Sequence, residues 1–123
     1  MPATTNDARV YRWDDLPRDR PMARLDRRRI IGAEFMISNV FLEKGCIVPS
    51  HKHDNEQMAM VTEGALKFIV GEGPGAREEI VRAGEVLHLP GNVAHSAEAL
   101  EDSRVLDIFS PVSEKTGIDE GQS

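Results

Sequence analysis

The sequence contains a single cysteine, few aromatic side chains and no long apolar run. Because Cys46 has no second cysteine to pair with, no intramolecular disulfide can form, and nothing favours an oxidising compartment. No run approaches the roughly 20 apolar residues that cross a membrane, and the first residues lack the basic and apolar regions of a signal peptide. We therefore expect a cytoplasmic protein with no membrane partner.

Positive charge is also scarce. The chain has 15 lysines and arginines against 21 acidic residues, which gives a net charge of −6. This balance provides no basic face for a phosphate backbone, so we expect no nucleic-acid partner. Residues 18–29 hold six arginines interleaved with Asp19 and Asp26. We interpret this segment as a solvated face or a subunit-contact strand, with an anion-binding arm as the alternative.

Short runs of β-branched and large apolar residues are present over residues 30–40 and 57–70, without a sustained helical period. Glycines punctuate these runs at Gly45, Gly64 and Gly84. Segment 71–75 is also rich in glycine, but it lacks the Lys-Ser/Thr ending of a phosphate loop and is interpreted as a hairpin turn. Closely spaced strands joined by turns predict an all-β antiparallel sandwich or barrel.

The length of 123 residues suits one domain. We expect this domain over residues 30–112. An N-terminal arm of residues 1–29 would precede it, and a flexible C-terminal tail of residues 113–123 would follow, because that end is polar and has no apolar periodicity.

Three of the four histidines are placed to bind one metal ion. His51 and His53 would point to the same face of an extended strand, because alternate side chains share a face. His95 follows the turn Pro90-Gly91-Asn92, which would start another strand and could bring a third imidazole to the same point. Three imidazoles with open positions beside them suit Zn, Ni, Mn, Fe or Cu, so the sequence predicts one divalent transition metal ion per chain.

The spacing around these histidines resembles two motifs of the cupin superfamily. The stretch Gly45-x5-His51-x-His53-x3-Gln57-x6-Gly64 resembles the first motif, and Gly84-x5-Pro90-Gly91-Asn92-x2-His95 resembles the second. The resemblance covers about residues 34–111 and implies a single jelly-roll, RmlC-like β-barrel. Tyr11 and Trp13, ahead of the arginine-rich segment, could form an exchanged strand, so we expect an irregular or strand-exchanged N-terminal arm. The chain departs from the motifs at Gln57, usually a glutamate, and at Asn92, usually a glycine. His88 belongs to neither motif, and we expect it to be a structural or rim residue.

Either Glu56 or Gln57 could complete the set of metal ligands. If the strand alternates, Gln57 shares a face with Ala59 and Val61, whereas Glu56 points the other way. The motif spacing also falls on Gln57, and Glu56 fits only if the turn at residues 54–55 is distorted. An amide in place of a carboxylate leaves the site one unit more positive, so a bound oxygen would be polarised more strongly. The predicted ligands are therefore His51, His53, Gln57 and His95.

Longer stretches resemble the small KdgF-type cupins of pectin degradation, namely His51–Gln57, Pro90–Asp102 and Leu106–Pro111. This resemblance implies the metal-dependent conversion of unsaturated uronates into linear ketonised sugars, which moves protons without net redox change. That family typically continues Phe-Ser-Pro-Pro-Arg, whereas this chain has Ser113 at the position of the arginine. Another basic residue, Lys67, Arg77 or an N-terminal arginine, would have to bind the substrate carboxylate.

Asp107 is the predicted catalytic residue. Val105, Asp107 and Phe109 share one face of a strand, where a carboxylate either points into a polar cavity or forms an ion pair. Asp107 also lies where the resembling family has its acid, so we interpret it as a proton shuttle or as a hydrogen-bond acceptor for substrate. Phe109, Ala59 and Val61 are expected to line the substrate pocket.

The favoured function is a non-redox isomerase or lyase acting on a small oxygenated, sugar-acid-like substrate. The alternatives are an Fe- or Cu-dependent dioxygenase and a non-catalytic module that binds a metal or a small ligand. Met58 and Met60 would face away from Gln57, which leaves apolar residues on both sides of the sheet. This pattern predicts a homodimer, although a loop of the same chain could cover that face instead.

Overall fold

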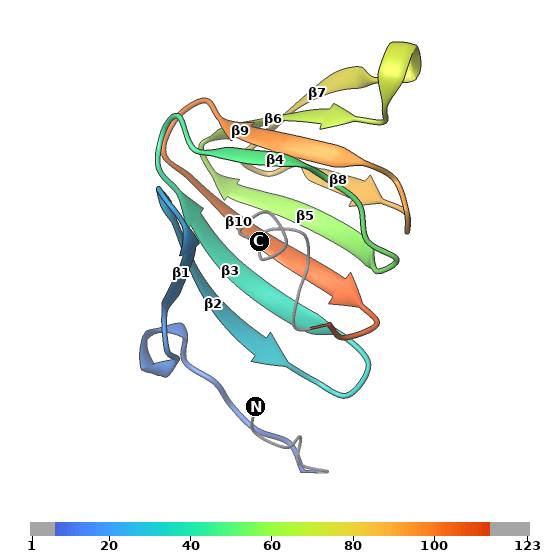
Figure 1. Ribbon diagram of the computed structural model, residues 1–123. Coiled ribbons are helices and arrows are strands. Elements are labelled where there is room, and N and C mark those ends of the chain that lie inside the picture. Colours follow the sequence, from blue (N-terminus) through green and yellow to red (C-terminus); the bar gives the residue numbers. More distant parts are fainter. Residues whose placement is uncertain (1–6, 114–123) are drawn as a thin grey trace.

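Two antiparallel β-sheets make up the computed structural model, which describes residues 7–113 (Figure 1). A six-stranded sheet has the order β1-β2-β3-β10-β5-β8, and a four-stranded sheet has the order β4-β9-β6-β7. The larger sheet consists of β1 (Asp19–Met22), β2 (Leu25–Ile31), β3 (Met36–Leu42), β5 (Glu56–Glu63), β8 (Val86–Leu89) and β10 (Ser103–Ser110). The smaller sheet consists of β4 (Ile47–His51), β6 (Ala65–Val70), β7 (Arg77–Arg82) and β9 (His95–Ala99). This architecture confirms the predicted all-β jelly-roll class.

The helices of the described residues are two short 3-10 turns, η1 (Trp13–Asp15) and η2 (Gly73–Gly75), and neither is long enough to cross a membrane. The second turn joins β6 to β7, which pair antiparallel from Ala65↔Arg82 to Val70↔Arg77. The glycine-rich segment 71–75 therefore forms the connection of a hairpin.

The arginine-rich N-terminal segment is part of the larger sheet. β1 pairs with β2, and β2 pairs with β3 over its whole length, from Leu25↔Leu42 to Ile31↔Met36. The boundary expected between residues 29 and 30 falls within β2. Residues 114–123, and with them nearly all of the expected C-terminal tail, lie outside the described residues.

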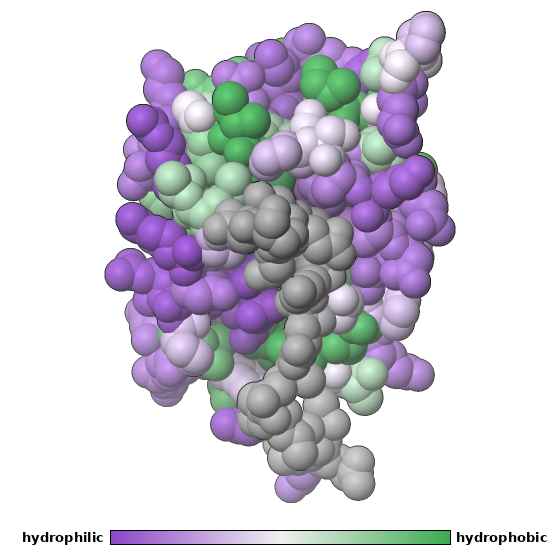
Figure 2. All heavy atoms as spheres, viewed as in Figure 1, coloured by the Kyte–Doolittle hydropathy of each residue, from purple (hydrophilic) through white to green (hydrophobic). Residues whose placement is uncertain are grey.

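Side chains alternate between the interior and the outer surface along the central strands. On β10 the interior positions are Ser103, Val105, Asp107 and Phe109, and on β3 they are Met36, Ser38, Val40 and Leu42. Apolar residues of the other sheet, including Leu66, Phe68 and Val70, complete the core. Each large apolar side chain buried in this way contributes about 1.5–3 kcal/mol. On the face of the molecule seen in Figure 2, hydrophilic residues dominate and hydrophobic residues form separate patches.

Several polar residues are buried within this apolar interior, among them Ser38, Gln57, His95 and Asp107. Polar side chains are seldom fully buried in a core without a hydrogen-bonding or functional reason. Their presence identifies the part of the barrel interior in which a functional site is to be sought.

The turn before β9 is held against the loop after β4. Asn92 adopts a φ of 65° and its backbone N–H donates to the carbonyl of His53 at 2.8 Å. A Cβ at Gly91 would lie only 2.6 Å from the carbonyl oxygen of Asp54, so no other residue permits this approach without a shift. Asparagine tolerates the left-handed conformation, which explains how Asn92 can replace the glycine usual at this motif position.

Candidate metal centre

Three imidazoles meet at one end of the barrel interior. His51 ends β4 and lies directly opposite His95, the first residue of β9, in the sheet register. His53 follows in the loop that the Asn92 contact holds in place. One nitrogen from each ring lies within 4.8 Å of the others, and ring centroids are 4.4–5.6 Å apart. These distances allow one metal ion to contact all three rings.

Backbone carbonyls fix which nitrogen of each ring faces the centre. In His51, Nδ1 lies 2.8 Å from the carbonyl oxygen of Pro49. The corresponding distance is 3.1 Å between His53 and the carbonyl oxygen of Asn55, and 2.9 Å between His95 and that of Val93. A carbonyl oxygen can only accept a hydrogen bond, so each Nδ1 must carry the proton. Each Nε2 is left with a lone pair, which is the form that binds a metal.

Beside the imidazoles, Nε2 of His53 and Oε1 of Gln57 are buried and have no hydrogen-bond partner among the described residues. The other end of the Gln57 amide is occupied, because its Nε2 donates to Oδ1 of Asp107 at 3.0 Å. An unsatisfied buried acceptor costs about 1–3 kcal/mol. A cation bound between the imidazoles and this amide oxygen would satisfy both atoms, so the residues present fit a metal ion.

Burial governs the protonation of the site. It lowers the pKa of His95 to about 4, with the nearby His51 and His53 acting in the same direction against the hydrogen bond to Val93. Burial also raises the pKa of Asp107 to about 7, against the hydrogen bond from Gln57, which lowers it. At neutral pH, therefore, His95 is uncharged and able to donate its lone pair, and Asp107 can exchange a proton.

A cavity of about 40 Å³ adjoins these residues. Its polar lining comes from His51, Gln57, His95 and Asp107, and its other lining residues are apolar, including Phe109. Since about 10–15 Å³ of such volume holds one water molecule, the cavity has room for an ion and a few small groups. Ala59 and Val61 are fully buried on the same face of β5, in the core rather than in the lining of this cavity.

Glu56 and His88 lie away from the three imidazoles. Gln57 is buried, whereas Glu56 is exposed on the opposite face of β5 and its Oε2 lies 2.6 Å from Nε2 of His88. Lys67 and Arg77 also point elsewhere, because their ion pairs with Glu98 and Glu79 lie at the surface. No lysine or arginine is among the described residues that line the cavity.

Two residues at the site were not singled out from the sequence. Asn55 is buried and donates from Nδ2 to the carbonyl oxygen of Pro111, which ties the His53 loop to the end of β10. Ser38 lies opposite Asp107 in the register of β3 and β10, and its Oγ is buried without a partner among the described residues. The alternation of β3 was the signal that could have placed Ser38 inside the barrel.

A small antiparallel barrel that gathers histidines from two paired strands, β4 and β9, and from the loop after β4 at one end of its interior defines a cupin-like protein. Residues 39–109 match the family model described as Cupin domain, and the chain belongs to this family. Among curated protein sequences, none matches the chain.

Solved structures similar to this chain share its fold. KdgF from a Halomonas species is 22% identical with a TM-score of 0.79, over 88% of this chain and 97% of that protein. An RmlC-like cupin from Shewanella frigidimarina is also 22% identical with a TM-score of 0.79, over 88% of this chain and 95% of that protein. An oxalate decarboxylase variant from Bacillus subtilis is 17% identical with a TM-score of 0.78; the match covers 93% of this chain but 33% of the decarboxylase.

Proposed function

We propose that this cupin is a metal-dependent isomerase or lyase that acts, without net oxidation or reduction, on a small oxygenated acid of the sugar-acid type. One observation carries this proposal. The amide of Gln57 donates from Nε2 to Asp107, and its Oε1 has no partner among the described residues. A ligand atom for a metal and a carboxyl group able to move a proton are therefore linked by one hydrogen bond in one cavity.

His51, His53, Gln57 and His95 would hold one divalent transition metal ion per chain, of the group Zn, Ni, Mn, Fe and Cu. Such an ion supplies Lewis-acid polarisation of substrate oxygens. Imidazole and amide ligands are both uncharged when they donate a lone pair, so these four ligands would not offset the charge of the ion.

Asp107 would accept a proton from the substrate and return it at another atom. Its carboxyl group lines the cavity, and the hydrogen bond from Gln57 fixes Oδ1, which leaves the second oxygen for the substrate. Phe109 lies in the wall of the same cavity, where its apolar ring would exclude water. Proton transfer by a positioned carboxyl group contributes about 10²–10⁴-fold to a rate.

The acid group of the substrate needs a cationic partner from outside the residues that line the cavity, because no lysine or arginine is among the described lining residues. Arg29 pairs with Ser38 in the register of β2 and β3, and Ser38 pairs with Asp107, so all three lie at one level of the inner sheet face. Arg29 contacts Asp19 at 3.8 Å, with a quarter of its side chain exposed. Within this proposal Arg29 takes the role of the missing arginine at position 113.

Metal content tests the ligand assignment. The protein, purified without a metal-binding tag and reconstituted, should hold one divalent ion per chain by elemental analysis. His51→Ala should hold none, and His88→Ala is the matched control, because His88 is the histidine on the outer face. The absence of any bound ion from the reconstituted unaltered protein would refute the metal centre.

Turnover tests the reaction class. An unsaturated uronate should lose its ultraviolet absorbance faster with the metal-loaded protein than spontaneously, without oxygen consumption. Asp107→Asn should abolish this acceleration while the metal remains bound. Absorbance loss at the spontaneous rate would exclude the uronate as substrate, and oxygen consumption would contradict the non-redox assignment.

A homodimer is part of this proposal. Met58 and Val86 are 38% and 51% exposed on the outer face of neighbouring strands β5 and β8. Large apolar residues exposed on neighbouring strands of a sheet face favour a protein contact. A second copy of this chain, packed through the same face, would cover them.

A further inference from the structure

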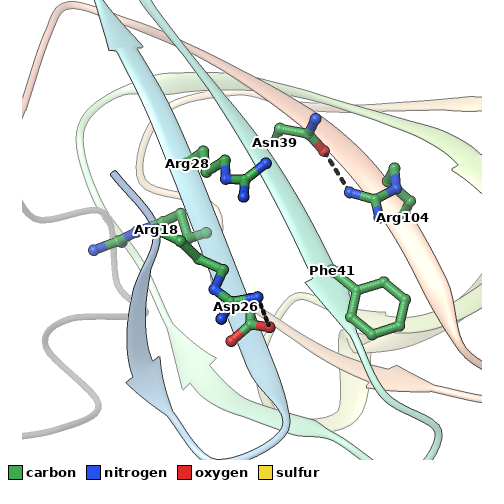
Figure 3. A pocket seen from close by; sticks show the side chains of 7 residues that line it. Arg18, Asp26, Arg28, Asn39, Phe41 and Arg104 are labelled. Carbon is green, nitrogen blue, oxygen red and sulfur yellow. Dashed lines mark hydrogen bonds and ion pairs between the residues drawn. The ribbon is translucent and has the colours of Figure 1, made fainter. Parts of the chain in front are cut away.

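A second hollow, with a volume of about 290 Å³, lies over β2, β3 and β10 (Figure 3). The lining on this side of the sheet includes Arg28, Asn39 and Arg104. Val40 follows Asn39 in sequence and pairs with Val105, which follows Arg104, and both valines point into the core. The hollow is therefore on the outer face of the six-stranded sheet and is separated by that sheet from the three histidines.

The lining of this hollow is basic in an acidic protein. The lining includes the side chains of three arginines, Arg18, Arg28 and Arg104, and of one carboxylate, Asp26, while the chain as a whole carries a net charge of −6; Arg27 borders the hollow from β2, but its side chain is buried on the inner face of the sheet. Asp26 is already paired, because Arg20 donates to it from Nε at 2.9 Å and Arg18 lies at 3.8 Å. Arg27 is likewise engaged by Asp19 through two hydrogen bonds. The charge left for a ligand is that of Arg28 and of Arg104, whose Nε lies 3.9 Å from Oε2 of the exposed Glu63 in a weak surface pair.

Arg28 has donor capacity that the described residues do not use. Its Nη1 contacts Oδ1 of Asp14 at 3.2 Å, but Asp14 is 98% exposed, and such surface ion pairs are weak and readily exchanged. Its Nε is buried and has no hydrogen-bond partner among the described residues. A buried donor without a partner is unfavourable, so a rotation of the partly exposed side chain that brings its N–H groups to an acceptor in the hollow would be stabilising.

Arg104 faces Arg28 across the hollow. Figure 3 shows both guanidinium groups directed toward Asn39, which lies between them on β3. Arg104 donates from Nη1 to Oδ1 of Asn39 at 3.2 Å, and its guanidinium carbon lies 5.3 Å from the ring centroid of Phe41. This packing holds the guanidinium group in place and leaves Phe41 as an apolar surface within the same hollow.

We propose that this hollow binds a small organic oxyanion, a molecule with a carboxylate or phosphate group attached to an apolar or aromatic part. The planar guanidinium groups of Arg28 and Arg104 would donate to the oxyanion from two sides, since arginine matches such groups with paired N–H donors. Phe41 would contact the apolar part. The site requires no metal and is independent of the function proposed above.

Isothermal titration of metal-free protein at low ionic strength tests the proposal, with phenyl phosphate, benzoate and inorganic phosphate as probes. One equivalent of phenyl phosphate or benzoate should bind saturably, and the probe with the higher affinity shows whether the site prefers a phosphate or a carboxylate. Inorganic phosphate should bind more weakly because it lacks the apolar part. Arg28→Gln and Arg104→Gln should each weaken binding by about tenfold or more. Arg104→Lys, which keeps the charge but loses the fork, should also weaken it.

Arg77→Gln is the matched control, because Arg77 is an exposed arginine of β7 paired with Glu79, and His51→Ala controls for the metal centre. Both should bind the probes like the unaltered protein. The proposal is overturned if none of the probes binds saturably, if Arg104→Gln and Arg104→Lys bind unchanged while folded by circular dichroism, or if His51→Ala abolishes binding. It is also overturned if sedimentation shows a dimer that Arg104→Gln dissociates, because the hollow would then be a contact between copies.

Discussion

Gln57 donates from Nε2 to Oδ1 of Asp107 at 3.0 Å, and this hydrogen bond joins the two candidate roles of the site. It fixes the rotation of the amide, so that Oε1 is the atom available to a cation. It also holds the carboxyl group of Asp107, which lines the cavity. A change at Gln57 therefore affects both ion binding and the position of the proton-transfer group.

Replacement of Gln57 should separate these effects. Gln57→Leu preserves bulk but removes the ligand oxygen and the donor to Asp107, so metal affinity should fall by about tenfold or more in a chelator competition. Gln57→Glu retains an oxygen at the same position and should keep the ion. Equal metal affinity in Gln57→Leu and the unaltered protein would remove Gln57 from the ligand set.

Metal removal should lower thermal stability. An ion that binds only the folded state, at about 100 times its dissociation constant, adds about 2.7 kcal/mol, which raises Tm by roughly 10 °C in a domain of this size. Chelator treatment should reverse this increase in the unaltered protein and in His88→Ala. His51→Ala should melt at the same temperature with and without added ion, and a metal-dependent increase in that variant would contradict the assignment.

Arg29→Gln should raise KM for an acidic substrate by about tenfold, because a charged hydrogen bond to the substrate is lost while Asp107 and the ligands stay in place. The value of kcat should change much less. Steady-state kinetics checks this split, with Arg77→Gln as the control. A loss confined to kcat would show that Arg29 does not anchor the substrate.

The thiol of Cys46 should be unreactive in the folded protein. It is buried beside the carbonyl oxygen of Ala23, at 3.7 Å, and burial raises the pKa of this thiol, so little thiolate is present at neutral pH. A colourimetric thiol reagent should label it completely in denaturant and only slowly in native buffer. Rapid stoichiometric labelling of the native protein would contradict this burial.

The outer face formed by Met58 and Val86 should mediate dimer formation. Met58→Glu would place a charge among these exposed apolar residues, so sedimentation velocity should show a monomer for this variant and a dimer for the unaltered protein. Ile80→Glu is the control, since Ile80 is 42% exposed on β7 of the other sheet. A monomeric unaltered protein at all concentrations would refute the dimer.

The sequence alone predicted the all-β fold and the face on which Gln57 lies. Alternation of side chains is a geometric property of a strand, so the parity of residues 57, 59 and 61 could be worked out without any tertiary contact. The meeting of His51 and His95 followed from two motifs whose spacing resembles that of cupins. The cytoplasmic location and the homodimer stay predictions.

The extent of β2 could not be predicted in the same way. β2 carries arginine on both faces, with Arg27 inward and Arg28 outward, so no apolar alternation marks it as a strand. Its strand conformation is stabilised by pairing with β3, and the spacing of apolar residues along the sequence cannot predict such a contact between two strands. The unpartnered Nε of Arg28 and the link from Asn55 to Pro111 likewise depend on residues that come together only in the folded chain.

The carbonyls that orient the three imidazoles belong to Pro49, Asn55 and Val93, each two residues from the histidine it holds. The acceptors that orient the centre thus belong to three short backbone segments next to the histidines themselves. A substitution that keeps the backbone of these segments keeps all three acceptors, because a carbonyl oxygen is present whatever the side chain. A single inserted residue between any of these carbonyls and its histidine, by contrast, would release one ring from its backbone acceptor.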